Sequence, residues 1–312
     1  MHKVYISKTF NPSFNLALEE YLVRRHDPSD QVLFLWQNQN TVVIGRNQNP
    51  WKECNIEEIK RLEGKLVRRL SGGGAVYHDL GNLNFTFISA YSKDKIAENI
   101  DLLIQVLAQH GIEAVFSGKN DILVQEAKIS GNAYFVEEDI LCHHGTLLLD
   151  VDMEKLGGIL TVSEKKLHSK GVDSVRSRVR NLKEFNRDLS IDDLTKSMTR
   201  TFLGAGHSNE ICLVSDRASE DAGIDLEEVK KLIERYESWE WNFGSTPEFN
   251  LEISERFHWG GIDLYLLVNE GIITNAEVNT DALDVDLPKK IQDLVCNTKF
   301  DHNELTVILN RV

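Results

Sequence analysis

The residues best suited to chemistry lie in one glycine-rich stretch. It reads Arg68-Arg69-Leu70-Ser71-Gly72-Gly73-Gly74-Ala75-Val76-Tyr77-His78-Asp79. Glycine lets the backbone approach a ligand closely and adopt positive φ angles, and successive free N–H groups in such a turn bind anions. Two guanidinium groups add permanent charge that suits phosphate or carboxylate. The stretch therefore predicts a site for a small anionic molecule, with a flexible hairpin tip as the alternative.

The same stretch does not match either of the common nucleotide-binding patterns. The three consecutive glycines fit neither G-x-G-x-x-G nor G-x-x-x-x-G-K-[ST]. The sequence therefore gives no reason to expect a Rossmann or P-loop site.

A second candidate segment combines a lysine with small residues. Lys128 comes just before Ser130-Gly131, where the backbone can approach a ligand, and the segment follows Asn120-Asp121. A lysine that points into a pocket is a suitable point charge for a phosphate or a developing oxyanion. Asp121 can hold Mg²⁺ or a ribose hydroxyl, but a turn carboxylate is an equally good interpretation.

Two further segments contain histidine or arginine at regular spacing. His143 and His144 are adjacent on an expected strand, so they point to opposite faces and make a poor metal-chelating pair. One of them is expected to face a pocket while the other packs. Arginines alternate over residues 176–180, within a polar stretch at 169–182. That stretch is either a solvated edge or a loop that folds over a bound phosphate.

Composition narrows the class of protein. The chain has 312 residues and a formal net charge of −14, which disfavours non-specific nucleic-acid binding because such binding depends on basic residues. We expect no membrane segment, since no apolar run is long enough to span a bilayer. The four cysteines (Cys54, Cys142, Cys212, Cys296) form no C-x-x-C pair. Free thiols in a reducing cytoplasm are therefore expected.

Hydrophobic spacing predicts the elements that position these residues. Helical periodicity marks residues 14–25, 56–62, 97–109, 191–202, 226–236, 288–296 and 303–310. Apolar or alternating runs predict strands over 32–36, 41–44, 66–69, 84–90, 122–124, 128–135, 140–150, 249–258, 262–269 and 272–279. Asn269-Glu270-Gly271 predicts a hairpin turn between the last two strands. Because the strands come in groups rather than in strict β–α alternation, the class is α+β with mixed or antiparallel sheets.

Taken together, the motifs resemble those of the lipoate–protein ligase family. The resemblance covers nearly the whole chain and rests on the glycine-rich stretch and on the following further segments: Phe14-Asn15-Leu16-Ala17, Val42–Arg46, Asn49-Pro50-Trp51, Lys128-x-Ser130-Gly131, His143–Leu147, Ser174–Val179, Trp239–Gly244 and Trp259-Gly260-Gly261. It implies a large catalytic domain over residues 1–244 that shares the biotin ligase fold. It also implies a small α+β accessory domain over residues 245–312.

The resemblance further implies an activity and its site. ATP would activate lipoate to lipoyl-AMP, with Mg²⁺ as the metal. The lipoyl group would then pass to a lysine of a 2-oxoacid dehydrogenase lipoyl domain or of the glycine-cleavage H protein. Lys128 would be the catalytic residue and Asp121 would lie by the Mg²⁺. The residues that would bind substrate and adenylate are Arg69, Ser71, Gly72, Gly73, Gly74, Ala75, Val76, Tyr77, Asn120, Asp121, Ser130, Gly131, His144, Lys170, Gly171, Val172 and Arg176.

Three other functions stay open at this point. A transferase of the same fold would need no ATP but would need a reactive thiolate, for which Cys142 is the candidate. A non-catalytic lipoate-binding protein would need no phosphate site. An enzyme that only transfers lipoyl from lipoyl-AMP made elsewhere would carry out the second step alone.

Overall fold

The largest element of the fold is a mixed eight-stranded sheet. The computed structural model describes residues 1–160, 179–204, 209–215, 223–243, 251–269 and 271–312. The strand order is β11-β1-β2-β6-β10-β9-β8-β7, and β1 pairs in parallel with both β2 and β11, whereas the other pairs are antiparallel. The strands are β1 (His2–Ser7), β2 (Gln31–Trp36), β6 (Asn82–Ala90), β7 (Val115–Phe116), β8 (Asp121–Val124), β9 (Ala127–Glu137), β10 (Ile140–Leu148) and β11 (Asn209–Val214).

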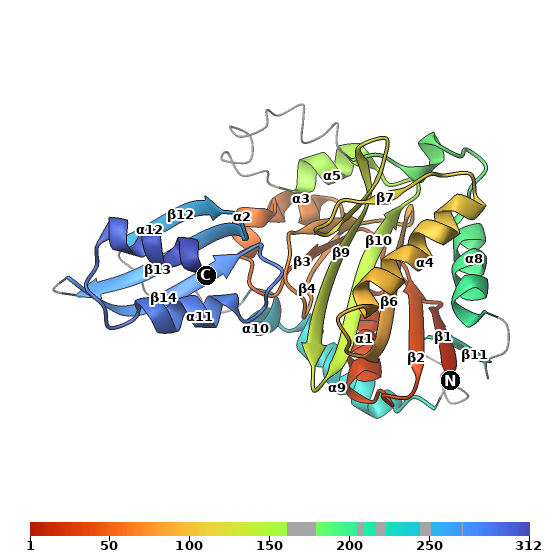
Figure 1. Ribbon diagram of the computed structural model, residues 1–312, viewed down its shortest axis with the longest axis horizontal. Coiled ribbons are helices and arrows are strands. Elements are labelled where there is room, and N and C mark those ends of the chain that lie inside the picture. Colours follow the sequence, from red (N-terminus) through yellow and green to blue (C-terminus); the bar gives the residue numbers. More distant parts are fainter. Residues whose placement is uncertain (161–178, 205–208, 216–222, 244–250, 270) are drawn as a thin grey trace.

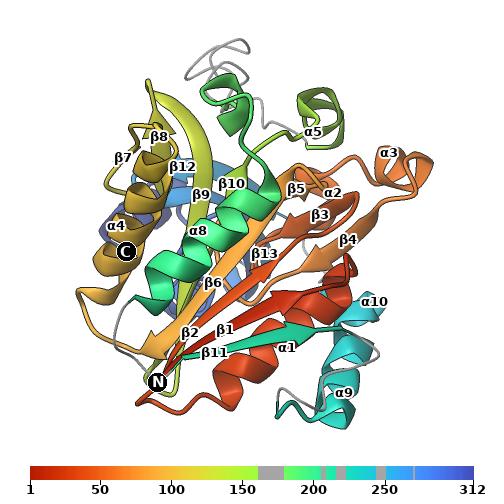
Figure 2. The ribbon, with the colours of Figure 1, turned by 90° about the vertical axis from the view of Figure 1, so that its right-hand side faces the viewer.

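Helices cover both faces of this sheet, as Figure 2 shows. On one face α1 (Pro12–Arg24) and α9 (Leu226–Glu237) bury an apolar core that includes Phe14 and Phe34. On the other face α4 (Lys95–Gln109) and α8 (Ile191–Leu203) bury a second core that includes Leu33 and Phe85. Adjacent residues of β2 therefore enter different cores, because successive side chains on a strand alternate between faces.

A second, three-stranded sheet holds the glycine-rich stretch. Its order is β4-β3-β5, formed by β3 (Thr41–Ile44), β4 (Lys65–Arg68) and β5 (Val76–His78). The glycine-rich loop joins β4 to β5, so both ends of the loop are fixed by strands that pair with β3. Short helices pack around this sheet, namely α2 (Pro50–Glu53), α3 (Ile56–Arg61) and α5 (Met153–Ile159).

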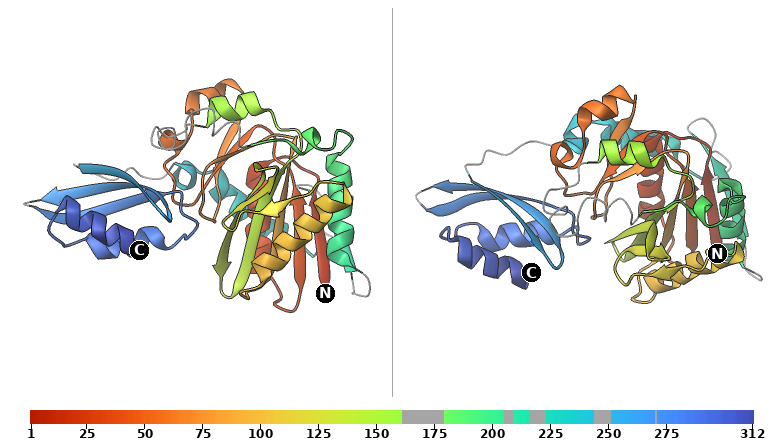
Figure 3. Two further views of the ribbon diagram at one scale, coloured as in Figure 1. Left: turned by 45° about the horizontal axis from the view of Figure 1, so that its top comes forward. Right: turned by 90° about the horizontal axis from the view of Figure 1, so that it is seen from above.

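The C-terminal part of the chain forms a small domain with its own core, shown in blue in Figure 1. It consists of the antiparallel sheet β12-β13-β14 and two helices. The bounds are β12 (Leu251–Phe257), β13 (Gly260–Asn269), β14 (Ile272–Thr280), α11 (Leu287–Val295) and α12 (His302–Arg311). In both views of Figure 3 this domain lies to one side of the large one, and the N-terminus lies on the other side.

The small domain contacts the glycine-rich loop directly. The Gly73 N–H donates to Ala282 O at 2.9 Å, and the Thr280 N–H donates to Asn47 O at 2.7 Å. A Cβ on Gly72 would lie 2.3 Å from Ala282 O, which is closer than real Cβ contacts allow. Glycine at position 72 is therefore required by the contact between the two domains.

The structure confirms the α+β class with a large mixed sheet and a small C-terminal domain. The helix expected at 14–25 is α1, and the last two strands form the expected hairpin, with residue 270 outside the described residues. Sequence patterns missed four strands, β1, β5, β7 and β11. The boundary expected after residue 244 falls in 244–250, which is also outside the described residues, and it stays a prediction. Among the described residues, no helix is both long and apolar enough to cross a bilayer.

The remaining short elements join these layers. They are a 3₁₀ helix (Leu182–Glu184) and α10 (Trp239–Asn242). The buried Arg68 side chain ties α10 to the loop after β3: it donates to Trp241 O and Asn242 O and also to Gly45 O, Arg46 O and Gln48 O. The Trp239–Gly244 motif thus has a local structural role, because its main chain accepts hydrogen bonds from a buried arginine.

Candidate active site

A cavity of about 130 Å³ lies between the large sheet and the β3–β5 unit. Nine of the residues that the sequence proposed for the site line this cavity: Arg69, Gly73, Gly74, Ala75, Val76, Asn120, Lys128, Gly131 and His144. Arg69 and Lys128 are far apart in the sequence, and the fold brings them to the same hollow. Further lining residues, among them Leu16, Trp36 and Val43, give much of the wall an apolar character.

Lys128 brings positive charge to one end of the cavity. Its Nζ lies 2.8 Å from Asp121 Oδ1 across the β8–β9 pair, and both side chains are about 30% exposed. The Lys128 carbonyl accepts from the Arg180 N–H at 3.0 Å, so the chain that returns after residue 178 fixes the backbone here. The ammonium is held in place and still open to solvent and to a ligand.

Gly131 makes room for the lysine side chain. A Cβ at this position would lie 3.0 Å from Lys128 Nζ and 3.1 Å from Lys128 Cε. The Gly131 N–H donates to Thr146 Oγ1 at 3.2 Å, which fixes the strand beside β10. The Lys-x-Ser-Gly pattern therefore has a geometric reason, because the lysine side chain lies over the glycine.

The Arg69 guanidinium holds the glycine-rich loop in shape. Nη2 donates to Gly72 O and Gly74 O at 2.7 and 2.8 Å, Nη1 donates to Val43 O at 3.1 Å, and Nε donates to Ser71 Oγ at 3.0 Å. Burial lowers the pKa of Arg69 to about 10, so the group stays charged at neutral pH. Most of its N–H groups are used by the loop itself, so Arg69 organises the loop that faces the ligand.

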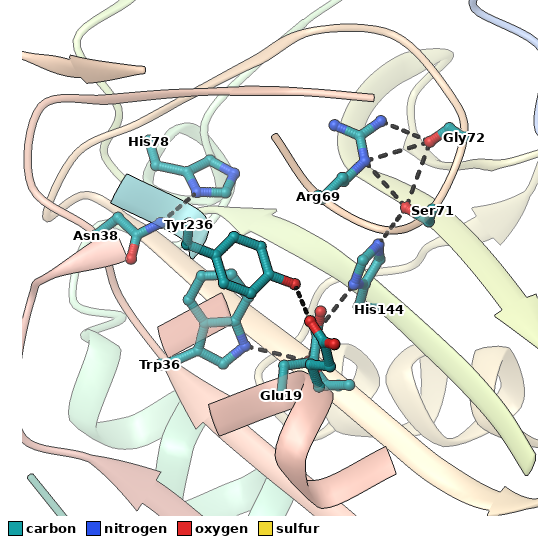
Figure 4. A network of polar contacts seen from close by, with 11 residues as sticks. Glu19, Trp36, Asn38, Arg69, Ser71, Gly72, His78, His144 and Tyr236 are labelled. Carbon is teal, nitrogen blue, oxygen red and sulfur yellow. Dashed lines mark hydrogen bonds and ion pairs between the residues drawn. The ribbon is translucent and has the colours of Figure 1, made fainter. Parts of the chain in front are cut away.

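A buried chain of side chains continues from this loop to α1, as Figure 4 shows. His144 Nε2 lies 2.6 Å from Ser71 Oγ, and His144 Nδ1 lies 2.9 Å from Glu19 Oε1. The Thr86 hydroxyl also donates to Glu19 at 2.6 Å. Since the carboxylate accepts, Nδ1 carries the proton, and Nε2 is then free to accept from the Ser71 hydroxyl. This chain fixes the His144 ring at the cavity wall.

The neighbouring histidine packs on the opposite face, as the strand alternation predicted. His143 Nε2 lies 3.1 Å from Asn132 Oδ1, and the ring packs beside Phe85 and Phe87. Burial lowers the pKa of His143 to about 3, so this imidazole is neutral. Glu19, Cys142 and His144 form the one potential metal-ligand cluster among the described residues. Both nitrogens of His144 have hydrogen-bond partners, Ser71 at Nε2 and Glu19 at Nδ1.

The remaining proposed residues do not line the cavity or are not described. Four of them lie next to lining residues, namely Ser71, Gly72, Asp121 and Ser130. Of these, Ser71 forms a hydrogen bond with the lining residue His144. The Tyr77 side chain lies elsewhere: it packs in the core between β3 and α5, and its hydroxyl donates to Asn40 Oδ1. Four proposed residues fall outside the described residues: Lys170, Gly171, Val172 and Arg176.

Several wall residues were missed by the sequence interpretation. These are Leu16, Trp36, Val43, His78, Asn84, Asn132, Ala133, Gly145 and Thr146. Glu19, which supports the wall from below, was missed too. A signal for Glu19 exists, because it is a carboxylate in the middle of a helix that is buried along nearly its whole length. For the apolar wall residues Leu16, Trp36 and Val43 no such signal exists, since an apolar residue has the same pattern in a core and in a cavity wall. His78 belongs to the glycine-rich stretch that the sequence did single out, but it was not proposed as a site residue.

A magnesium ion fits this end of the cavity only as a partner of phosphate groups. Asp121 offers one carboxylate beside Lys128, and its Oδ1 is paired with the Lys128 ammonium at 2.8 Å. Mg²⁺ keeps several waters and is commonly held by one or two carboxylates together with substrate phosphates. The donor set is therefore compatible with an ion that arrives with a nucleotide.

Comparison with known proteins places this fold and site in a defined class. Residues 11–203 match the lipoyl protein ligase A/B catalytic domain. Residues 246–312 match the bacterial lipoate protein ligase C-terminus. The first match defines the class of protein, and together the two matches show that the chain belongs to the lipoate–protein ligase family.

Individual relatives agree with this assignment. The chain is 40% identical over 311 residues to lipoate-protein ligase A of Psychrobacter cryohalolentis, covering 97% of this chain and 90% of the relative. It is 42% identical over 298 residues to lipoate-protein ligase A of Bdellovibrio bacteriovorus, covering 94% of this chain and 86% of the relative.

Solved structures give the same result. P. falciparum LipL1 in complex with lipoate superposes with a TM-score of 0.83 at 28% identity, covering 100% of this chain and 95% of that one. Lipoate-protein ligase A bound with ATP superposes with a TM-score of 0.64 at 25% identity, covering 78% of this chain and 98% of that one. A bi-partite ligase of Thermoplasma acidophilum, solved in a study of the ligase and its E2 lipoyl domain, has a TM-score of 0.66 at 26% identity. It covers 80% of this chain and 98% of that one.

Proposed function

We propose that the protein activates lipoate with ATP to give lipoyl-AMP and pyrophosphate, and then transfers the lipoyl group to a lysine of a carrier protein. The observation that carries the proposal is a single cavity with an apolar wall and with the Lys128–Asp121 pair at one end. The relatives named as lipoate-protein ligase A support it, as do the neighbours with lipoate or ATP bound.

The first step needs positive charge because it joins two anions. The lipoate carboxylate oxygen attacks the α-phosphorus of ATP, and the bond from that phosphorus to the pyrophosphate oxygen breaks. The Lys128 ammonium stabilises the negative charge that grows on the phosphoryl oxygens. When bound, Mg²⁺ supplies further charge neutralisation for the triphosphate, and Asp121 is the residue that would hold it.

The second step transfers the acyl group. The neutral amine of the carrier lysine attacks the acyl carbonyl carbon of lipoyl-AMP and forms an amide bond. The bond from that carbon to the phosphate oxygen breaks, AMP leaves as an anion, and the amine proton passes to solvent. Lys128 then faces the oxygen of the tetrahedral centre. Arg69 and the Glu19–His144–Ser71 chain contribute indirectly, because they fix the loop and the wall that hold the acyl chain in position.

The thiol-dependent transferase finds no support in the geometry. Cys142 is completely buried and does not line the cavity. Burial raises the pKa of the Cys142 thiol well above its usual range, so the thiolate that a nucleophile requires is not formed. The enzyme that only transfers preformed lipoyl-AMP has the same cavity, and the measurement of pyrophosphate separates it from the complete ligase.

The carrier proteins and the location complete the proposal. We propose as acceptors the lipoyl domains of 2-oxoacid dehydrogenases, the H protein of glycine cleavage, or both. The work on the Thermoplasma ligase and its E2 lipoyl domain favours the first class. A cytoplasmic location agrees with four unpaired cysteines.

Intact-mass measurement of a purified lipoyl domain tests the function. We expect one lipoyl addition after incubation with enzyme, lipoate and Mg·ATP, release of pyrophosphate, and no addition without ATP. Cys142→Ala should retain activity within about threefold, because the thiol does not touch the cavity. Modification without ATP, lost in Cys142→Ala, would instead support the transferase.

A further inference from the structure

Two buried hydrogen-bond donors without an acceptor belong to residues that line the cavity. They are His78 Nε2 and Asn84 Nδ2, and neither has a partner in the structure. The residues are 3% and 1% exposed, and both line the cavity. Buried polar groups are nearly always paired, so two unpaired donors at one wall call for an explanation.

The hydrogen bonds around His78 fix which of its nitrogens carries the proton. Asn15 Nδ2 donates to Asn38 Oδ1 at 3.0 Å, so Asn38 presents its NH₂ group to His78 Nδ1 at 3.4 Å. His78 Nδ1 is therefore an acceptor, and burial lowers the pKa of His78 to about 3, which keeps the ring neutral. In a neutral imidazole with an accepting Nδ1, the proton is on Nε2. His78, which lines the cavity, thus carries an unpaired N–H group.

Asn84 offers a second donor in the amide orientation that the structure gives it. Its Oδ1 accepts from Asn82 Nδ2 at 2.9 Å, which leaves the Asn84 NH₂ group without an acceptor. Asn84 lies directly opposite Trp36 in the β2–β6 pair, and the Trp36 ring packs against His78 with centroids 6.2 Å apart. The two donors therefore belong to one part of the cavity wall.

This part of the wall lies away from Lys128. The strand order is β2-β6-β10-β9, with Trp36 on β2, Asn84 on β6 and Lys128 on β9. Neighbouring strands are about 4.8 Å apart, so the backbones of Asn84 and Lys128 lie roughly 10 Å apart across the sheet. An acid whose carboxylate lies at Lys128 would place the far end of its chain beside His78 and Asn84.

We propose that the N–H groups of His78 and Asn84 select an acyl chain with hydrogen-bond acceptors at its far end, such as the two sulfurs of lipoate, over a saturated chain such as octanoate. The inference rests on the proposed function and adds the substrate selectivity of the same cavity. A saturated chain would fill the cavity and leave both donors buried and unpaired, whereas sulfur is an acceptor, although a weak one. We expect each donor to contribute about tenfold to the discrimination.

The test measures kcat/KM of pyrophosphate release for lipoate and for octanoate. In His78→Phe, which keeps an aromatic ring against Trp36 but has no donor, the lipoate-to-octanoate ratio should fall about tenfold. Asn84→Ala should lower the ratio in the same direction. His78→Gln retains an N–H donor and should recover most of the ratio. Asn120→Ala, at the Lys128 end of the cavity, is the control. It should change kcat/KM for lipoate and for octanoate by the same factor, so that their ratio stays the same.

The outcomes separate this inference from the proposed function. An unchanged ratio in both His78→Phe and Asn84→Ala would overturn the inference, and it is the result expected if the donors only hold a water molecule. If wild-type protein released no pyrophosphate with either acid, the proposed function would fail instead. Calorimetric binding of the two acids without ATP would then still measure the selectivity. If His78→Phe does not fold, the lipoate-to-octanoate ratios of Asn84→Ala and His78→Gln provide the test.

Discussion

The two ends of the cavity are built on opposite principles. At the β8–β9 end, the Lys128 ammonium is ionised, about 30% exposed and paired with a carboxylate. At the β2–β6 end, His78 and Asn84 are neutral and almost completely buried, and each has an unpaired donor. The charged group, Lys128, lies where water can solvate it until a phosphate binds. The groups that we propose for selectivity, His78 and Asn84, lie where burial makes an unpaired hydrogen-bond donor costly.

Two adjacent arginines, Arg68 and Arg69, have structural roles in different parts of the fold. Arg68 and Arg69 look equivalent in the sequence, but both are buried and both donate mainly to carbonyl groups of the protein. Arg68 joins α10 to the loop after β3, whereas Arg69 holds the glycine-rich loop. Within the part of the chain that the structure describes, the charge available for chemistry at the cavity is therefore that of Lys128, and these two arginines build the frame around it.

The largest effect is expected at the charged end. Lys128→Ala should lower the rate of pyrophosphate release by about 10²–10³, because it removes a preorganised charge from the transferring phosphoryl group. The free energy of unfolding should change by less than about 1 kcal/mol, since the ion pair with Asp121 is partly exposed. A pyrophosphate assay and urea unfolding measure the two quantities.

Lys119→Ala provides the matched control, because this exposed lysine lies near the same strands but does not line the cavity. Its rate should equal that of the wild type. A near-normal rate of pyrophosphate release in Lys128→Ala would show that the ammonium does not stabilise the phosphoryl group. The β8–β9 end would then not be the catalytic end of the cavity.

A smaller effect is expected when the lysine is displaced rather than removed. Gly131→Ala places a methyl group 3.0 Å from Lys128 Nζ and 3.1 Å from Lys128 Cε, so the flexible side chain must shift slightly. We expect roughly a tenfold loss of the rate of lipoyl-AMP formation from the misplaced charge, with the fold retained. Gly158→Ala, whose added methyl group would meet no atom within 4 Å, is the control for the substitution itself. Equal rates in the two variants would show that the position of the ammonium matters little.

The smallest effect concerns stability and belongs to the buried end. The pKa of His78 is lowered to about 3 by burial, whereas an unfolded histidine titrates near 6.5. Between these values the unfolded chain binds the proton and the folded one does not, so stability is complete above pH 6.5 and falls as the pH falls. The loss should approach about 1.4 kcal/mol for each pH unit below 6.5.

Urea unfolding at pH 7.0 and pH 5.5 checks this expectation. Wild-type protein should lose about 1 kcal/mol more stability than His78→Phe over this interval. The comparison cancels the contribution of His143, whose pKa is lowered in the same way and which is present in both proteins. Identical pH dependence would mean that the His78 ring is not buried in its neutral form.

Much of the fold was predictable because it depends on local patterns. The alternation of β9 and β10, the periodicity of α1 and α4 and the hairpin after Asn269 all follow from neighbouring residues. The strands β1 and β11 were not predictable in this way. They pair in parallel with each other across about 200 residues, and such a partner leaves no nearby signal.

The residues of the candidate site were likewise predictable only in part. Residues with distinctive chemistry, such as Lys128 and the glycine triplet, were found from type and spacing. Tyr77 shares that motif, yet its side chain lies in the core behind β5, because neighbouring residues of a strand face opposite sides. His78 and Asn84 could not be assigned from the sequence, since their unpaired state depends on Asn38 and Asn82 and on the space beside them.

The sequence alone determined the class of fold, the family resemblance and the cations and glycines that an adenylating site requires. These follow from residue types at short spacing, where covalent geometry limits the possibilities. Only the tertiary structure decided which charges stay available and which donors stay unpaired. Both properties depend on burial and on hydrogen bonds between segments that are distant in the chain, and no short stretch of sequence contains that information.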